Sequence, residues 1–550
     1  MTEDRQSFWR RHRWVKWVAV GLLAALTLAA AVLGVVLQRA EPFLRARIVE
    51  GLEDRFHARV ELDSFHVSLV DGLWAEGHGL RIWPPARVAG VTVPQGQDEP
   101  LIRLNEFRFH APLELKPGKP IHVSLVELKG LSVHLPPKSH FEHVADAAAA
   151  GKSRSAMAGL VRFEVDRMEC TGAELVMETD KPGKLPLEFQ IARFKLTDIA
   201  AGGAMGFDAE LTNPKPEGTV HTTGSFGPWH GADLGESPLK GDYRFEHADL
   251  SGITGIAGIL SSTGHYEGTL RDLVVDGQTE TPDFRLTHFG AALPLTTRFH
   301  ARVDGTNGDT WLEPVDATLG HSHFTAQGAI VRVPGAVVAG AQQYGGHDIA
   351  LAVNVDRARM EDFLRLASRT GNVLLTGDVT MKTSLHIPPG MASIDKRMTL
   401  NGSFALDKAL FTSEKIQGRI TELSLRGQGR PEDLNTTDPA SILSEMQGSF
   451  RMAGGVVTLP ALEYTVPGAK IQLAGTYGLA DGALNFAGTA KMEASVSKMV
   501  GGWKGMLLAP ADHLFKRDGA GAEVPIHIEG TREEPKFGID FEHLLPGEKR

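Results

Sequence analysis

Residues 60–85 read VELDSFHVSLVDGLWAEGHGLRIWPP, and this stretch carries the pattern that decides the fold. Apolar side chains recur at or near every second position, and Asp71-Gly72 and Gly77-His78-Gly79 interrupt them. A period of two is typical of β-strands with one dry face and one solvated face. Asp and Gly favour turns. The stretch therefore predicts short strands joined by turns.

The alternation is strictest in FRFHAPLEL (107–115) and continues in IHVSL (121–125) and VRFEV (161–165). In each segment the odd-numbered residues are apolar, whereas most residues between them are polar. We expect the odd-numbered residues to share one apolar face of a sheet. The candidates for lining a binding surface on that face are Phe107, Phe109, Leu113, Leu115, Ile121, Val123, Leu125, Val161, Phe163 and Val165.

Glycine-containing phrases punctuate the second half of the chain, among them NGSFAL (401–406), QGSFRM (447–452) and AGTYGL (474–479). Because glycine tolerates turn and bulge conformations, each phrase is interpreted as a turn followed by a strand. Helices are expected to be few. Their expected positions are 42–60, 139–150, 357–369 and 495–517, the last being amphipathic and either packed across the sheet end or in contact with a membrane.

The N-terminus contains VAVGLLAALTLAAAVLGVVL (18–37), an uncharged and largely apolar segment. As a helix with a rise of about 1.5 Å per residue, it would cross the roughly 30 Å hydrocarbon core of a bilayer. Arginines and a lysine precede it, which predicts a cytoplasmic N-terminus and a chain that continues on the far side. A cleaved signal peptide is the alternative. The anchor residues are Val18, Leu22, Leu26, Leu33 and Leu37.

Composition narrows the function classes. The chain of 550 residues has a formal net charge of -10, which argues against a nucleic-acid partner. Its 61 glycines and 30 prolines favour many turns over long helices. Cys170 is the only cysteine, so an internal disulfide or a thiolate metal cluster is excluded, and a small buried residue is expected there.

No common catalytic motif occurs in the sequence, neither a phosphate-binding glycine loop nor a nucleophile elbow nor an HExxH pair. His321 and His323 have metal-like spacing, but no nearby ligand completes a set. Asp304–Asp309, DGTNGD, predicts a tight Asn-Gly turn rather than a calcium loop. We therefore expect no enzyme activity, no catalytic residue, no metal and no cofactor.

Three C-terminal segments, LNGSFALDKALF (400–411), QGSFRMAGGVVTLPALEYTVPGAKIQLAGTYGLADGALNFAGTAKM (447–492) and VPIHIEGTREEPKFGIDF (524–541), together resemble the C-terminal region of AsmA-like proteins. The N-terminal order of an anchor helix, a short helix from Pro42 and the strands from residue 59 is also similar to that family. The central part, about 140 to 390, is similar mainly in its general pattern of glycine-punctuated strands.

The resemblance implies a mostly β fold: a long curled antiparallel sheet, or β-taco, that forms an open lipid-binding groove, with one transmembrane helix and a few short capping helices. Such proteins hang from the bacterial inner membrane into the periplasm, and the TamB and YhdP types are linked to phospholipid movement towards the outer membrane. The implied partners are a phospholipid or other acyl-chain lipid, the inner membrane and other envelope proteins, with no nucleic acid.

The residues favour lipid binding and phospholipid transport on physical grounds as well. Exposing lipid tails to water costs about 0.8 kcal/mol per CH₂, and an apolar strip of sheet would remove most of that cost. The expected regions are a basic tail (1–17), a transmembrane helix (18–37), an N-terminal helix with the first strands (38–138), a central groove region (139–390) and a C-terminal region (391–550). Two alternatives stay open. One is a structural or assembly factor of the cell envelope built of β-sandwiches, and the other is an anchored envelope hydrolase.

Overall fold

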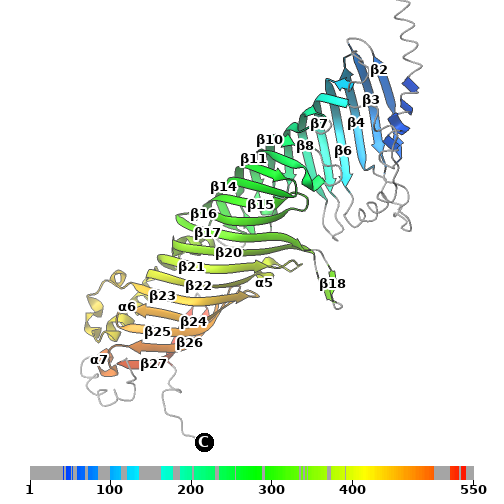
Figure 1. The fold of residues 1–550 in the computed structure, drawn as a ribbon. Helices are drawn as coiled ribbons and strands as arrows, with labels where there is room; N and C mark the ends of the chain where they lie inside the picture. Colours follow the sequence, from blue (N-terminus) through cyan, green and yellow to red (C-terminus); the bar gives the residue numbers. More distant parts are fainter. Residues whose placement is uncertain are drawn as a thin grey trace, which may run out of the picture. The chain divides into compact units, whose positions relative to one another are not determined.

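The computed structural model describes most of the strand-forming sequence. The described residues are 41–42, 45–46, 48–50, 52–53, 59–68, 72–83, 100–112, 121–135, 163–177, 186–200, 203–228, 234–253, 255–287, 291–333, 336–338, 341–343, 345–367, 373–390, 392–500, 521–531 and 534–539. Strands dominate these residues and helices are few (Figure 1). The expected mostly β fold class is therefore confirmed.

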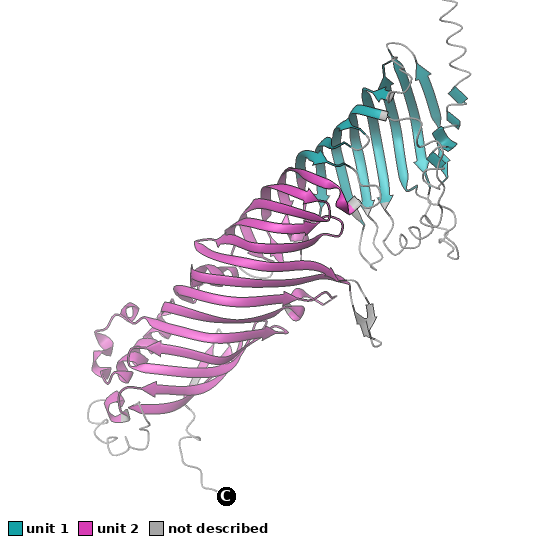
Figure 2. Cartoon of the chain, in the orientation of Figure 1, with its two compact units in different colours: residues 1–214, 220–229 teal, residues 215–219, 230–550 magenta. Residues whose placement is uncertain are grey.

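The chain divides into two compact units, coloured teal and magenta in Figure 2. Unit 1 comprises residues 1–214 and 220–229, and unit 2 comprises residues 215–219 and 230–550. The boundary falls between residues 214 and 230, within the stretch that the sequence analysis named the central groove region (139–390).

The strands of unit 1 are β1 (Val60–Glu61), β2 (Ser64–Ser68), β3 (Leu73–Ile82), β4 (Ile102–Ala111), β5 (Ile121–Val123), β6 (Leu125–Leu135), β7 (Phe163–Met177), β8 (Leu187–Ile199) and β9 (Met205–Pro214), followed by β10 (Glu217–Phe226) at the boundary. The pairs β2–β3, β3–β4, β4–β6, β7–β8 and β8–β9 are antiparallel.

The sheet of unit 1 is not purely antiparallel, which corrects one detail of the expectation. Strand β7 runs parallel to both β5 and β6. Parallel neighbours need a crossover connection of about a dozen residues or more. The chain between Leu135 and Phe163 is long enough to supply it. Sequence alternation alone does not distinguish the two directions.

The main strands of unit 2 are β11 (Pro238–Asp249), β13 (Ile259–Thr269), β14 (Asp272–Leu286), β15 (Leu293–Asp304), β16 (Asp309–Leu319), β17 (Ser322–Val333), β20 (Gly346–Arg359), β21 (Leu375–Ile387), β22 (Thr399–Phe411), β23 (Ser444–Ala453), β24 (Val456–Val466), β25 (Ala469–Gly478), β26 (Ala483–Met492), β27 (Ala522–Thr531) and β28 (Pro535–Ile539). Each pairs antiparallel with the next one in this order.

This series is open, because none of the described pairings joins β28 back to β11. The short strand β12 (Ile256–Ala257) pairs with β14. Among the described strands, β18 (Ala336–Val338) and β19 (Ala341–Gln343) pair with each other and with no third strand. The described residues of unit 2 thus form one sheet and a small hairpin, rather than the two large sheets of a sandwich.

The helices of unit 2 are short. They are α4 (Met360–Ala367), α5 (Ile394–Arg397), α6 (Glu414–Gly427) and α7 (Val496–Val500), with 3₁₀ turns η1 (Leu234–Glu236), η2 (Leu250–Gly252), η3 (Pro431–Asn435) and η4 (Pro439–Ser441). Helix α4 confirms the helix expected at 357–369, although residues 357–359 still belong to β20. Helix α7 confirms the start of the one expected at 495–517.

Other helical expectations are only partly visible. Described residues between 41 and 53 are helical, as the Pro42 segment predicted. The helix expected at 139–150 lies outside the described residues. The expected span at 18–37, with Val18, Leu22, Leu26, Leu33 and Leu37, also lies outside them. Within the described residues, no helix has the length and apolar character needed to cross a membrane.

Among the described strands of unit 2, six contain a β-bulge, namely β11, β14, β16, β20, β22 and β24. Three of these bulges contain a proline, namely Pro282, Pro314 and Pro460. Proline cannot donate to a strand ladder, so within a sheet it is tolerated at bulges and edges. The bulges therefore explain how these strands hold proline between two neighbours.

The glycine phrases do not mark turns before strands, which corrects the sequence interpretation. Gly402 and Gly448 lie in the middle of β22 and β23, and Gly77 lies inside β3. Each is directly opposite an aromatic residue: Gly402 opposite Phe450, Gly448 opposite Phe404, and Gly77 opposite Phe107. The absence of a side chain leaves room for the neighbouring ring.

Candidate binding surface

The register of unit 2 places apolar residues of successive strands on one side of the sheet, here called the apolar face. In β20–β22, for example, Leu351 is opposite Leu385, which is opposite Leu400. Directly opposed residues point to the same side of a sheet. Further members are Tyr266, Val275, Ala301, Leu312, Phe404, Phe450, Leu462, Leu473, Phe486 and Ile528.

The opposite side of unit 2, here called the polar face, carries the intervening residues. In β25 and β26 it bears Lys470, Gln472, Asn485 and Lys491. Among the described residues of β11–β28, the register puts a charged side chain on the apolar face only at Arg332, near the end of β17. The expected separation into one dry and one wet face therefore holds for unit 2.

Burial follows the same alternation. In β25, Ala469, Ile471 and Leu473 are buried, whereas the residues between them are exposed. In β13–β15 the residues of the apolar face are mostly half-buried and those of the polar face mostly exposed. The apolar face is thus partly shielded from water without being fully closed.

Helices cover only part of the apolar face. Residues Met360, Phe363 and Leu364 of α4 pack against a buried cluster that includes Val355 and Leu406. Residues Ile416, Ile420 and Leu423 of α6 pack against the buried cluster Tyr464, Val466, Ala469, Ile471, Leu473, Phe486, Ala490, Met492 and Ala522. By contrast, Leu351, Leu385 and Leu400 lie outside both clusters.

Helix α4 is fixed to the sheet by Asp362, whose side chain is 1% exposed. Its carboxylate accepts hydrogen bonds from the His321 backbone N–H at 2.9 Å and from the Ser322 hydroxyl at 2.8 Å. Hydrogen bonds to a charged acceptor are stronger than neutral ones. The turn between β16 and β17 therefore holds the first turn of α4 in place.

Helix α6 turns a polar stripe towards the protein. Gln417 donates to the carbonyl oxygens of Pro439 and Ile442, both at 2.9 Å, and accepts from the Phe411 N–H at 3.1 Å. Ser424 donates to the Pro467 carbonyl at 2.7 Å. All these partners lie in segments that border the sheet, so α6 is held by specific hydrogen bonds as well as by apolar packing.

A broad depression lies on the polar face of β20–β26, with a volume of about 950 Å³. Its lining includes Lys382, Ser403, Gln447, Glu463 and Gln472. Glu463 forms an ion pair with Lys470, and that hydrogen bond lowers the pKa of Glu463. The depression lies on the side away from the apolar face, and its lining mixes these polar residues with small apolar ones such as Ala405, Ala461 and Ala474.

Unit 1 has an apolar face of its own, to which several of the expected lining residues belong. Phe107 is 4% exposed and packs with Leu62, Phe65 and Leu104. Phe109 is 36% exposed, and its ring centroid lies 5.4 Å from that of Phe107. Phe109 is thus the more accessible of the two rings.

Left-handed glycines keep this face apolar where the simple alternation would fail. Gly79, Gly130 and Gly172 occupy β3, β6 and β7 with φ values of 68°, 64° and 63°. Val126 and Leu128 precede Gly130, whereas Leu131 and Val133 follow it, so the phase shifts by one residue. Only glycine adopts this conformation without strain.

Val123, Val165 and Leu125 were expected on one face, but the structure separates Leu125 from the others. Val123 is buried and Val165 packs in the same cluster. Leu125 is opposite His110, whereas Val126 is opposite Phe109. The phase changes because Ser124 interrupts the alternation between β5 and β6. Leu125 therefore lies on the polar side.

The remaining candidates are not fully described. Leu113, Leu115 and Val161 lie outside the described residues. Ile121 and Phe163 are placed in strands and are opposite each other, and their side chains lie outside the description.

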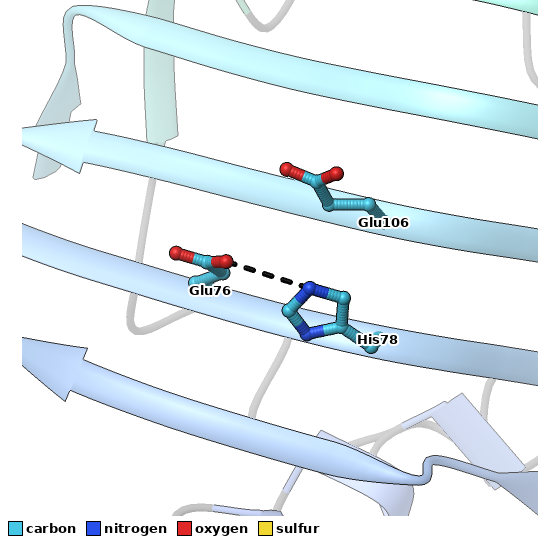
Figure 3. Close-up of side chains that lie close together, drawn as sticks. All are labelled: Glu76, His78 and Glu106. Carbon is cyan, nitrogen blue, oxygen red and sulfur yellow. Dashed lines mark ion pairs between the residues drawn. The ribbon is translucent and has the colours of Figure 1, made fainter.

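Glu76, His78 and Glu106 form a side-chain group on the polar side of unit 1 (Figure 3). His78 Nε2 lies 3.5 Å from Glu76 Oε1. Arg108 pairs with both carboxylates, and Lys129 donates to Glu106, which lowers the pKa of Glu106. Because two cations already neutralise these carboxylates, the arrangement is that of a surface ion-pair network rather than a metal site.

Three smaller motifs are also resolved. His321 lies in the turn before β17 and His323 within the strand, and each is near a different aspartate, Asp362 and Asp316. The backbone carbonyl of Asp304 accepts hydrogen bonds from the N–H groups of Asn307 and Gly308, which confirms the tight turn. Cys170 is buried, as expected, and burial raises the pKa of its thiol.

No protein-family model, curated protein or solved structure matches this chain.

Proposed function

We propose that this chain binds the acyl chains of lipids along the apolar face of its sheet and helps to move or distribute phospholipid in the bacterial envelope, without catalysis. The observation that carries the proposal is the continuity of the apolar face through the antiparallel series from β11 to β28. Stretches of that face, around Leu351 and Leu385, lie outside the helix-covered clusters.

The physical argument concerns water and charge. A sheet with one dry face must cover that face, either with protein or with another apolar material. Each methylene group removed from water stabilises the complex by about 0.8 kcal/mol, so two lipid tails have a strong preference for such a surface. Lipid binding would remove few charged side chains from water, because the described residues of the apolar face are almost all uncharged, so the desolvation cost is small.

The finer architecture belongs to the same proposal. We propose that the sheet curls into a β-taco, and the bulges in β11, β14, β16, β20, β22 and β24 support this, since a bulge bends its strand and increases the local twist. The resemblance of the C-terminal segments to AsmA-like proteins supports the same shape.

The proposed location is the bacterial inner membrane, with one N-terminal span at residues 18–37, a cytoplasmic N-terminus and the sheet in the periplasm. The apolar composition of residues 18–37 and the basic residues before them support this location. Other proteins of the envelope are proposed as partners in addition to lipid.

A non-transporting assembly factor of the envelope is the second candidate function. Two exposed apolar side chains that lie close together on the polar face favour it: Trp311 is 44% exposed and Val274 is 37% exposed. Arg302 lies between them, opposite both. Exposed aromatic and apolar groups of this kind are common in protein interfaces.

A complementation experiment separates the two functions. In native cells that lack the gene, phospholipid is pulse-labelled and its movement between membranes is followed. A chain with Ser384→Glu, on the polar face, should restore the wild-type rate, whereas Leu385→Glu, on the apolar face, should not. The chain must be present at equal levels by immunoblot. Equal restoration by both variants would contradict lipid transport along this face.

A further inference from the structure

A group of four neutral hydroxyl side chains lies among the apolar residues on the apolar face of unit 2, in strands β11–β15. The register aligns Ser262, Thr279 and Thr297 in one row across β13, β14 and β15. Tyr243 of β11 reaches this row, because its hydroxyl lies 3.1 Å from Ser262 Oγ. The four hydroxyls share a side of the sheet with Tyr266, Val275 and Phe299.

The hydrogen bonds within this cluster leave one hydroxyl proton without an acceptor inside it. Ser262 donates to the Gln278 carbonyl at 3.1 Å, so its contact with Tyr243 uses the proton of the tyrosine. Thr279 and Thr297 are 2.7 Å apart at their Oγ1 atoms, and one donates to the other. Their pair has two protons and a single mutual bond. One threonine proton therefore remains to be donated to a further acceptor.

Two glycines fix the position of the Tyr243 hydroxyl. Gly264 and Gly277 are directly opposite each other, in the row next to Ser262 and Thr279. A Cβ atom at Gly264 would lie 2.7 Å from the Tyr243 ring, and one at Gly277 would lie 2.8 Å from its hydroxyl oxygen. The ring thus lies across both glycines. Burial raises the pKa of Tyr243, which keeps the hydroxyl protonated and neutral.

The charge of the site restricts its ligand. The residues of β11–β15 that the register places on this face are all uncharged, so a phosphate would find no cation there. A carbonyl oxygen, by contrast, requires only a hydroxyl donor. The glycines and rings also leave a flat apolar surface on which hydrocarbon can lie.

We propose that the group formed by Tyr243, Ser262, Thr279 and Thr297 is a subsite for the ester carbonyls of a glycerolipid, with the spare threonine proton donated to one ester oxygen. This inference rests on the proposed function and deepens it, because it assigns the ligand class to ester-linked lipids and places the charged headgroup away from this part of the face. A lipid with ether-linked chains lacks the carbonyl acceptors and would bind less tightly here.

The test uses the full-length chain in detergent micelles and two photoactivatable lipids. Both carry the same headgroup and the same diazirine-bearing chains, one as a diester and the other as a diether. After irradiation, labelled peptides from β13–β15 and from β20–β22 are quantified by mass spectrometry. The variants are Thr279→Val with Thr297→Val, which keep the branched shape, and Thr296→Val, the neighbouring threonine on the polar face.

We expect the diester to label β13–β15 of the wild type about 5–10-fold more than the diether, since one hydrogen bond contributes roughly 1–1.5 kcal/mol. The double valine variant should label equally with both lipids, and Thr296→Val should keep the preference. Equal labelling by both lipids in the wild type would overturn the ester subsite alone. If neither lipid labels β13–β15 or β20–β22, the proposed function itself fails.

Discussion

At the residue scale, the polar face of unit 2 contains an alternating row of acid and histidine. Asp242 is opposite His265, His265 is opposite Asp276, and Asp276 is opposite His300. His265 Nδ1 lies 3.1 Å from Asp242, and His300 Nδ1 lies 2.7 Å from Asp276. Opposite charges that face each other across strands stabilise a sheet. This row links four strands whose other face is apolar.

His300 should make the stability of unit 2 depend on pH. Its hydrogen bond to Asp276 raises the pKa of His300 above the ordinary value of 6.5. The stabilisation is therefore fully present below pH 6.5 and is lost as the pH rises through the raised pKa. His300→Gln should lower the free energy of unfolding more at pH 5.5 than at pH 8.5 in chemical denaturation. An equal loss at both pH values would contradict this assignment.

Gly402 should not tolerate even the smallest side chain. A Cβ atom there would lie 2.5 Å from the Lys382 carbonyl oxygen and 2.8 Å from the Phe450 ring. Gly402→Ala should therefore destabilise unit 2 by about 1–3 kcal/mol, the usual cost of overpacking. Ser403→Ala, on the polar face, is the control and should change stability by less than about 0.5 kcal/mol. Similar effects of both changes in denaturant unfolding would refute the packing argument.

At the element scale, α4 depends on one buried carboxylate. Asp362→Ala would leave the His321 N–H and the Ser322 hydroxyl without this acceptor. The expected loss is about 2–4 kcal/mol, because each buried donor left unsatisfied costs roughly 1–3 kcal/mol. Ser322→Ala should cost less, and the double variant should cost less than the sum of the two. Full additivity in a double-mutant cycle would show that the two side chains do not interact.

Helix α6 offers a stabilising change. Gly418 lies inside the helix, and a Cβ atom there would have no heavy atom within 4 Å. Gly418→Ala should raise the free energy of unfolding by about 0.5–1 kcal/mol, because alanine restricts the unfolded chain and favours helix. Thermal unfolding followed by circular dichroism checks this. A lower midpoint for the variant would mean that the helix packs differently around residue 418.

How far the sequence predicts these elements depends on which interaction decides each one. Period-two alternation predicted strands around residues 107–111, 121–125 and 163–165, because local side-chain direction decides the pattern. Leu125 was predicted on the apolar face but lies on the polar side, because Ser124 changes the phase of the alternation. The parallel pairing of β7 was missed as well, because it depends on contacts distant in sequence.

Helix α6 was also missed, although a signal exists in the sequence. Ile416, Ile420 and Leu423 recur at helical spacing, and all three pack against the sheet. The polar residues Gln417 and Ser424 hide this pattern, since they are buried through hydrogen bonds to loop carbonyls rather than exposed. The cluster of four hydroxyl side chains in β11–β15 was not predicted either, because it depends on the register between strands.

At the scale of the whole molecule, each unit presents one apolar side and one polar side. In unit 2 the apolar face runs through the antiparallel series from β11 to β28, and α4 and α6 cover limited parts of it. In unit 1 the left-handed glycines maintain an apolar face through β3, β6 and β7. The proposed function follows from this one-sidedness, because lipid tails would complete a surface that protein covers only in part.

The most direct test places a photo-crosslinking amino acid at each of residues 349–354 of β20 in turn, within the full-length chain in cells. The register puts Ile349, Leu351 and Val353 on the apolar face and Ala350, Ala352 and Asn354 on the polar face. After irradiation, mass spectrometry should find phospholipid adducts at 349, 351 and 353 and none at 350, 352 and 354. Protein adducts alone, or lipid adducts without this period of two, would contradict the account.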